Sequence, residues 1–307
     1  MINKKIVIAT VLAITISFSS GCALVNKPNP TENPGIGSKV DETVQQDIMK
    51  EYENIISKEI NISDYIAFVD KNIGSLTPEN ATKLITKLEE LQKEYLSKLE
   101  DKYIDDEIQT KIIEILKPEF DLENLKSDKI EDAEVKELLK ETEELGYKVE
   151  TAEGMFFPII DYGFYEQYSV YVTEDMKDYI AIMTVESDKV PAKDAALVIS
   201  WDELFERLFN QEKFLDEHKD SVKLEEVKSL HKKYISFAIY GLNNTPLFDY
   251  ENNMMNDKAK AAYEKVIAKE GKLSQNLKEY YDLIKNNGYK LTEEVKNYRD
   301  KLAESIE

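Results

Sequence analysis

The stretch TPENATKLITKLEELQKEYLSKL, residues 77–99, decides the fold class. Thr77 stands where a helix N-cap belongs, and Pro78 suits the first helical position, so a helix is predicted to start here. Five apolar side chains follow at spacings of 4, 3, 4 and 4 residues: Leu84, Leu88, Leu91, Tyr95 and Leu99. This spacing places them on one face and predicts a long helix that packs along a neighbour.

Helical patterns continue on both sides of this stretch. Apolar residues at helical spacing, together with stop and start signals, predict helices over 44–60, 108–116, 131–145, 174–187, 201–208 and onward, 224–240, 254–270, 274–287 and 292–306. Pro118, Gly146 and Gly241 are the predicted stops. Ser200 and Glu203 form a predicted capping box. The fold class is therefore mainly α, in one or more multi-helix, bundle-like domains.

One central segment interrupts the helical pattern. Residues 146–179 read GYKVETAEGMFFPIIDYGFYEQYSVYVTEDMKDY and hold nine of the protein's 30 aromatic residues. Glycines and Pro158 break any regular period, so we expect irregular chain with one short strand at 147–151. We place a domain boundary near residue 146, with an N-terminal helical region over 41–146. The aromatic segment and a C-terminal helical region follow over 147–307.

Acids and rings alternate in this aromatic segment, which makes it the first candidate site. The candidate ligand residues are Glu153, Phe156, Phe157, Asp161, Tyr162, Tyr165 and Tyr168. Aromatic faces can stack on sugars or hold cations, and adjacent carboxylates can orient hydroxyls or amines. A glycosidase-like pair would need two carboxyl groups about 5–10 Å apart. The alternative is that these rings form the core between two helical halves.

The connector LNNTPLFDYENN, residues 242–253, is the second candidate site. It is polar and carries two rings, Phe248 and Tyr250, that look exposed, and loops on rigid scaffolds often carry function. The candidate contact residues are Asn243, Asn244 and Asp249. The alternative is a simple helix-to-helix turn at Asn-Thr-Pro.

Charge and motif content exclude several classes of function. The formal net charge of −21 argues against a nucleic-acid partner, because that affinity rests on cationic contacts to phosphate. Basic partners or cations would be attracted, or the charge serves solubility alone. His218 and His231 are the only histidines, and no HExxH, phosphate-loop, GxGxxG or GxSxG pattern is present. We therefore expect no metal site and no cofactor.

The N-terminus has the anatomy of a secretory signal peptide. Lys4 and Lys5 precede 13 uncharged residues, IVIATVLAITISF at 6–18, and small residues follow. The apolar run is too short to span a bilayer of about 30 Å, although an uncleaved anchor helix is the alternative. Residues 22–40 are rich in proline and glycine and predict an extended linker.

The only cysteine, Cys22, sharpens this prediction. Ser20-Gly21-Cys22 resembles the end of a lipobox, the processing site of bacterial membrane lipoproteins, with Ser19 where that class usually has Leu. The resemblance implies cleavage after residue 21 and lipidation of Cys22, which would place the protein on the extracytoplasmic face of the cell membrane. An ordinary cleaved signal peptide with an incidental cysteine is the alternative.

These observations together predict a lipid-anchored, extracytoplasmic helical protein. We expect it to bind a cell-envelope component, either a glycan or a partner protein, without catalysis. The alternative is a carbohydrate-active enzyme or substrate-binding lipoprotein that acts on cell-wall glycan through an aromatic and carboxylate groove. Under either prediction, we expect the protein to contact the membrane through its lipid anchor.

Overall fold

The chain is mainly α, which confirms the predicted fold class. The computed structural model describes residues 41–58 and 60–305, of which helices take up 67 %. Strands occur in this part of the chain only as short antiparallel pairs. The predictions for the signal peptide, for Cys22 and for the linker lie outside the described residues.

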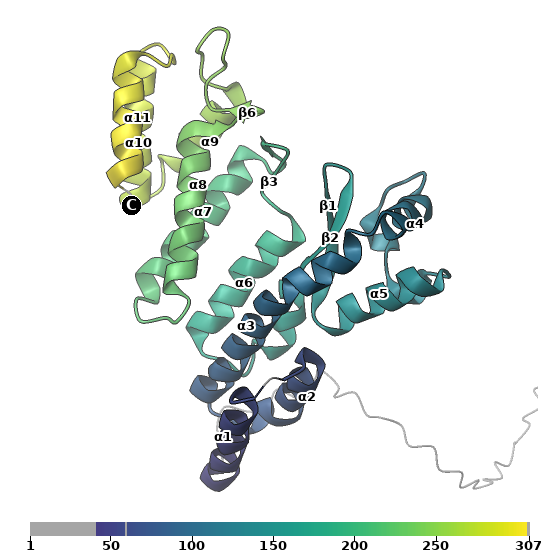
Figure 1. The fold of residues 1–307 in the computed structure, drawn as a ribbon. Helices are drawn as coiled ribbons and strands as arrows, with labels where there is room; N and C mark the ends of the chain where they lie inside the picture. Colours follow the sequence, from purple (N-terminus) through teal and green to yellow (C-terminus); the bar gives the residue numbers. More distant parts are fainter. Residues whose placement is uncertain (1–40, 59, 306–307) are drawn as a thin grey trace, which may run out of the picture. The chain divides into compact units, whose positions relative to one another are not determined.

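The long predicted helix is α3 (Pro78–Tyr103), which crosses the N-terminal half (Figure 1). Leu84, Leu88 and Leu99 on its predicted face are fully buried, whereas Leu91 and Tyr95 are half-buried. Thr77 is at the N-cap position, but its side chain makes no cap bond. Its backbone N–H instead donates to Gln45 Oε1 (2.8 Å) and connects the start of α3 to α1 (Glu42–Ile56).

The helix predicted over 44–60 ends earlier than expected, and an unpredicted helix follows it. Helix α1 (Glu42–Ile56) ends early, and α2 (Ile62–Asn72) begins after Asn61, whose side chain accepts a hydrogen bond from the Ser63 N–H (2.9 Å). The prediction was wrong because Ile60 fits the helical spacing of α1, although a strong N-cap residue follows it. Helices α4 (Asp106–Leu116) and α5 (Ala133–Glu144) match their predicted positions.

The aromatic segment is more regular than predicted. Strand β1 (Tyr147–Ala152) confirms the predicted strand, but it pairs with a second strand, β2 (Met155–Ile160), in a hairpin. The turn at Glu153 and Gly154 has positive φ at both residues (51° and 80°), as a tight two-residue hairpin requires. The 3-10 helix η4 (Tyr162–Tyr168) and helix α6 (Glu174–Asp188) follow.

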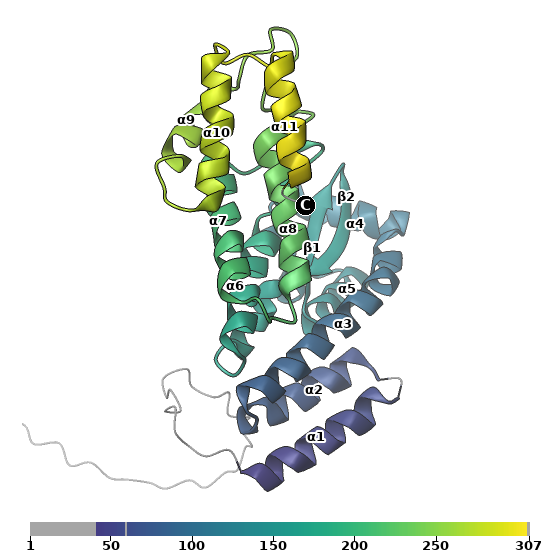
Figure 2. The same ribbon diagram turned by 90° about the vertical axis from the view of Figure 1, so that its left-hand side faces the viewer.

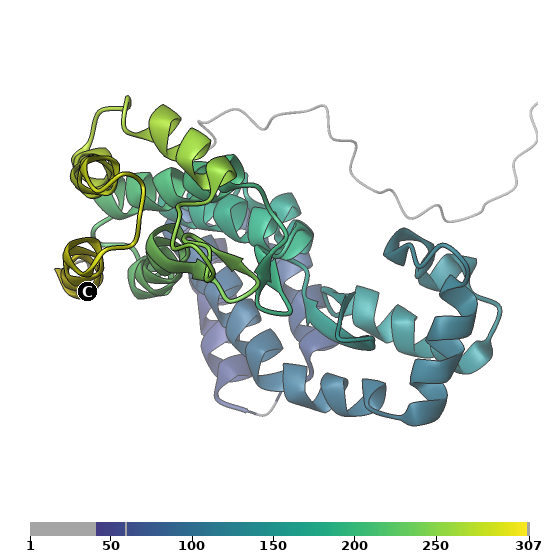
Figure 3. The ribbon, with the colours of Figure 1, turned by 90° about the horizontal axis from the view of Figure 1, so that it is seen from above.

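The C-terminal part is built from five helices in the described chain: α7 (Trp201–Glu217), α8 (Leu224–Tyr240), α9 (Asp257–Val266), α10 (Lys272–Asn286) and α11 (Glu293–Ser305). Two-residue ladders β3–β4 (Ala192–Lys193, Ala196–Leu197) and β5–β6 (Gly241–Leu242, Thr245–Pro246) accompany them. Helices α10 and α11 lie side by side (Figure 2) and are seen nearly end-on in Figure 3. The capping box is half formed: Ser200 Oγ accepts from the Glu203 N–H, but the Glu203 carboxylate pairs with Arg207.

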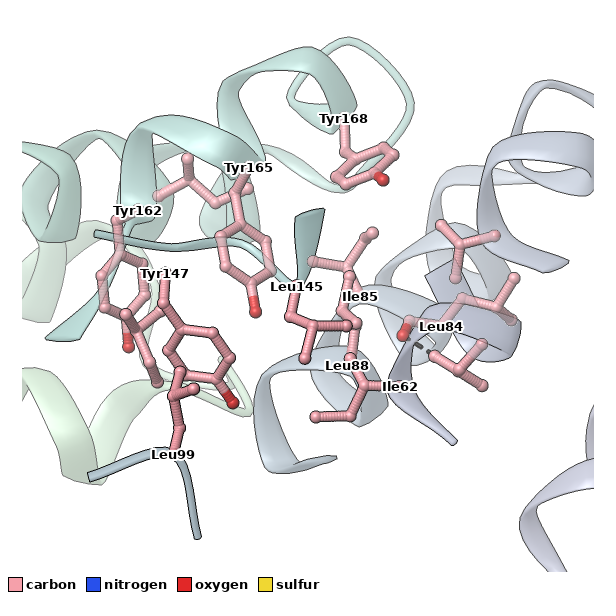
Figure 4. Close-up of a cluster of buried hydrophobic side chains, with 14 of the residues drawn as sticks. Ile62, Leu84, Ile85, Leu88, Leu99, Leu145, Tyr147, Tyr162, Tyr165 and Tyr168 are labelled. Carbon is pink, nitrogen blue, oxygen red and sulfur yellow. Dashed lines mark hydrogen bonds between the residues drawn. The ribbon is translucent and has the colours of Figure 1, made fainter. Parts of the chain in front are cut away.

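Buried apolar side chains form two clusters. The first takes residues from 48 to 180 and adds Phe214 and Val227 from α7 and α8, and the second spans 199 to 302. Leu145 and Tyr147, which flank the boundary predicted near 146, both belong to the first cluster. Figure 4 shows Tyr147, Tyr162 and Tyr165 among the aliphatic side chains there. The boundary at 146 itself stays a prediction.

Candidate functional site

The three tyrosines of the first candidate site belong to the hydrophobic core. Tyr162, Tyr165 and Tyr168 all come from η4, are buried, and lie beside the leucines of the first cluster (Figure 4). Each hydroxyl donates to a side chain: Tyr162 to Glu89 (2.5 Å) and Tyr165 to Gln92 in the interior, and Tyr168 to the exposed Asp70 (2.7 Å). With their faces packed and hydroxyls satisfied, these three rings present no open stacking surface.

The other residues of this first site are spread along the hairpin. Phe156 is buried and Phe157 is half-buried on the opposite face of β2. Glu153 is exposed at the hairpin tip, whereas Asp161 lies at its base and pairs with Lys148 (3.1 Å). The length of the hairpin separates these two carboxylates by about 20 Å. That is well beyond the spacing of a glycosidase pair.

The second candidate site is a braced turn. The Asn244 side chain donates to Asp194 O (2.6 Å), which joins the β5–β6 turn to the β3–β4 turn. Asp249 is exposed and accepts backbone hydrogen bonds from Glu251 and Asn252 (3.0 and 3.1 Å). Asn243 is exposed beside them. Of the two rings expected to be exposed, Tyr250 is exposed, but Phe248 is buried in the second cluster, so that expectation was wrong for Phe248.

A buried ionic cluster surrounds Glu89, on α3, and was not predicted from the sequence. Its carboxylate is 2 % exposed and meets Lys93 (2.8 Å), the hydroxyls of Tyr162 and Tyr179 (2.5 and 2.6 Å), and Lys223. Burial would raise the pKa of Glu89, but Lys223 and the hydrogen bonds outweigh it and lower the pKa to about 2. The carboxylate is therefore ionised and fully partnered, which marks a structural link rather than a reactive acid.

A cleft between α6 and α7 has a different character. Its volume is about 250 Å³, and both helices supply its lining. Ala181, Ile182, Val185 and Phe214 give it apolar walls, while Glu186, Arg207 and Gln211 are its polar members toward the interior. A concave, mostly apolar pocket with a few placed polar groups is the usual form of a small-molecule site.

Arg207 organises the polar end of the α6–α7 cleft. Its guanidinium donates to Glu186 (3.2 Å), to Lys189 O (2.9 Å) and to Glu203 (2.6 Å). The Tyr234 hydroxyl also donates to Glu186 (2.5 Å). Burial raises the pKa of Glu186 despite these partners. The arginine charge is thus compensated inside the protein, and its Nε has no hydrogen-bond partner among the described residues.

Gln211 is the unusual residue of the cleft. Its side chain is 0 % exposed, and in the described structure neither its Nε2 nor its Oε1 has a hydrogen-bond partner. Leaving a buried polar group unpaired costs about 1–3 kcal/mol, and most such groups in native proteins are paired. Gln211 therefore holds one unpaired donor and one unpaired acceptor in the wall of the cleft, and its side chain has to turn to present them to a ligand.

Three potential metal ligands lie at the other end of the cleft. His218 Nε2 is 2.9 Å from Asp178 Oδ2, and one Glu217 oxygen completes a group whose atoms lie within 4.8 Å of one another. Such a group could bind a divalent cation. The side chains of Asp178 and Glu217 are about half exposed, so water can satisfy both carboxylates.

The sequence contains a signal for Gln211 that none of the motifs considered above captures. Leu204, Leu208 and Gln211 follow one another at spacings of 4 and 3 residues, so Gln211 falls on the apolar stripe of α7. A polar residue on such a stripe is buried, and without a hydrogen-bond partner its burial costs free energy. Arg207 falls on the same stripe, three residues after Leu204, but apart from Glu203 its partners come from distant positions that no local pattern reveals.

Comparison of the chain with protein-family models, with curated proteins and with solved structures found no match. Across residues 41–58 and 60–305, none of the helices combines the length and the apolar character needed to cross a bilayer.

Proposed function

We propose that this protein is a lipid-anchored binding protein on the outer face of the cell membrane. Its helical body would bind a cell-envelope component through the α6–α7 cleft. The motif Ser20-Gly21-Cys22 after a short apolar run supports the anchor. Two acyl chains hold a protein on a membrane where one chain gives only marginal binding.

The unpaired carboxamide of Gln211 is the observation that carries the binding role. A ligand that pairs with both of its polar atoms would recover the cost of their burial. The volume of about 250 Å³ suits a small molecule or one group that projects from a larger envelope molecule. This places the proposed contact at α6 and α7 instead of at the packed rings of η4.

Metabolic labelling tests the anchor. Cells grown with a radioactive or clickable fatty acid should label the full chain, and Cys22→Ala should remove the label and release the protein from membranes. Label that persists in Cys22→Ala, or wild-type protein recovered entirely in the soluble fraction without label, would refute the anchor.

Affinity capture tests the binding role separately. The full chain, immobilised and exposed to solubilised envelope, should retain a glycan, lipid or protein component that Gln211→Met does not retain. Wild-type protein recovered alone under mild conditions would count against the proposal. So would identical material on both columns, because the cleft would then have no part in the binding.

A further inference from the structure

We infer that the α6–α7 cleft recognises a neutral primary carboxamide or a lactam, presented by a small ligand or by the end of a larger one. This inference rests on the proposed binding role of the cleft and names the chemistry of its ligand. It follows from three properties of the cleft: hydrogen-bonding pattern, charge and wall composition.

The hydrogen-bonding pattern comes from Gln211. Both of its polar atoms are buried and unpaired, so a turn of the side chain toward the cleft would present Nε2 as a donor and Oε1 as an acceptor, side by side on one planar group. A primary carboxamide or a lactam shows its own N–H and C=O on the same side, so it can close a ring of two hydrogen bonds with Gln211. A trans secondary amide shows them on opposite sides and can make only one, and a carboxylate offers acceptors without a donor.

Charge at the polar end disfavours ionised ligands. The guanidinium of Arg207 is already paired with Glu186 and Glu203, and the other cation of the lining, Lys213, is exposed to water and lies 3.8 Å from Glu217, so no buried cation awaits an anion. An anionic ligand would meet Glu186 within the cleft and Asp178 at its other end. A cationic ligand would have to displace Arg207 from its carboxylate partners. A neutral ligand avoids both costs.

The lining of the cleft limits the size of the ligand and determines the chemistry of the part that carries the carboxamide. Ile182, Val185 and Phe214 offer apolar contact beside Gln211, so the carboxamide should be attached to a short apolar body. The volume of about 250 Å³ lies near the lower end of ligand pockets. Benzamide combines one ring with one primary carboxamide and is a suitable probe.

The test compares three probes that share one phenyl ring on the full chain in lipid nanodiscs. Saturation-transfer NMR should show binding of benzamide, and binding at least tenfold weaker for N,N-dimethylbenzamide, which lacks the donor, and for benzoate, which carries a charge. Empty nanodiscs measure partition into lipid. Equal binding of all three probes would overturn the carboxamide preference while leaving the cleft as a binding site.

Two glutamine variants separate recognition from folding. Gln211→Met removes the unpaired amide, so it should weaken benzamide binding at least tenfold without lowering the melting temperature. Gln109→Met is the matched control, because the buried amide of Gln109 is fully used by Tyr103 O (2.6 Å), Phe156 O (2.7 Å) and the Phe156 N–H (2.9 Å). It should lower the melting temperature and leave the benzamide affinity unchanged. Unchanged affinity in a folded Gln211→Met, or no binding of benzamide to the wild type, would refute the inference.

Discussion

The carboxylate of Glu89 joins α3 to Lys223, ahead of α8, inside the protein. Lys223 is also almost fully buried, with 4 % of its side chain exposed. Without Glu89, Lys223 keeps only Glu226 (3.2 Å), whose side chain is 43 % exposed, so a buried charge stays poorly compensated. This costs far more than removing both members of the pair.

We therefore predict that Glu89→Gln lowers the free energy of unfolding by about 3 kcal/mol. The double variant Glu89→Gln, Lys223→Met should recover most of that loss, because the glutamine oxygen can still accept from Tyr162 and Tyr179. Urea unfolding of the four proteins of the cycle measures the coupling. Additive losses would contradict the prediction. In the wild type, the stability due to the lowered pKa of Glu89 is present above pH 4.5 and is lost as the pH falls toward 2.

His231 on α8 provides a prediction at higher pH. Burial lowers its pKa from 6.5 to about 4, so the folded protein keeps the imidazole neutral while the unfolded chain protonates it. The unfolded state then binds more protons between pH 6.5 and 4, and stability falls as the pH falls through this window, by about 3 kcal/mol in all. Thermal unfolding of wild type and His231→Gln across pH 4–7.5 measures it. The variant should lose less stability over this window, and parallel curves would contradict the assignment.

Single residues also show where sequence reasoning stops. Glu89 and Glu141 are both acidic residues within predicted helices, yet the side chain of Glu89 is buried and that of Glu141 is part-exposed. Burial of Glu89 depends on residues more than 70 positions away, such as Tyr162 and Lys223, which no local pattern brings together. Gln211 could have been found, because its position on an apolar stripe is a local property.

The C-terminal ends of helices were the features that local chemistry predicted best. Gly146 and Gly288 each follow a helix, each begins a Gly-Tyr-Lys sequence, and both have positive φ (76° and 67°). Helix α2 and strand β2 were missed for opposite reasons. Apolar residues of α2 follow directly after those of α1, so the pattern hid the break. Strand β2 contains Pro158 and is stabilised chiefly by pairing with β1.

The two glycines give a matched prediction. A Cβ at Gly146 would lie 2.4 Å from Gln92 Nε2, and that side chain is held by Leu145 O and Tyr165, whereas a Cβ at Gly288 meets nothing within 4 Å. Gly288→Ala should therefore cost only the backbone strain, about 1 kcal/mol, and Gly146→Ala about 3 kcal/mol, because overpacking is added. Chemical denaturation compares the two, and equal losses would show that the contact at Gly146 relaxes freely.

Both hydrophobic clusters depend on the same helices. Helix α7 gives Leu204 and Leu208 to the second cluster and Phe214 to the first, and α8 likewise gives Val227 to the first. Sequence composition suggested a boundary near 146 because the aromatic content changes there. Composition cannot show that the rings after 146 fill the core of the helices before it, which is a property of long-range packing.

These shared helices predict that the full chain unfolds in one cooperative transition. Trp201, the only tryptophan, is buried in the second cluster, so its fluorescence reports on that cluster alone. Hydrogen exchange of the α3 amides reports on the first cluster. The two probes should give the same midpoint in urea, because loss of the second cluster removes Phe214, Val227 and Lys223 from the first. Loss of the Trp201 signal while α3 stays protected would show that residues 41–188 fold on their own, and that the charged link at Glu89 does not couple the two halves.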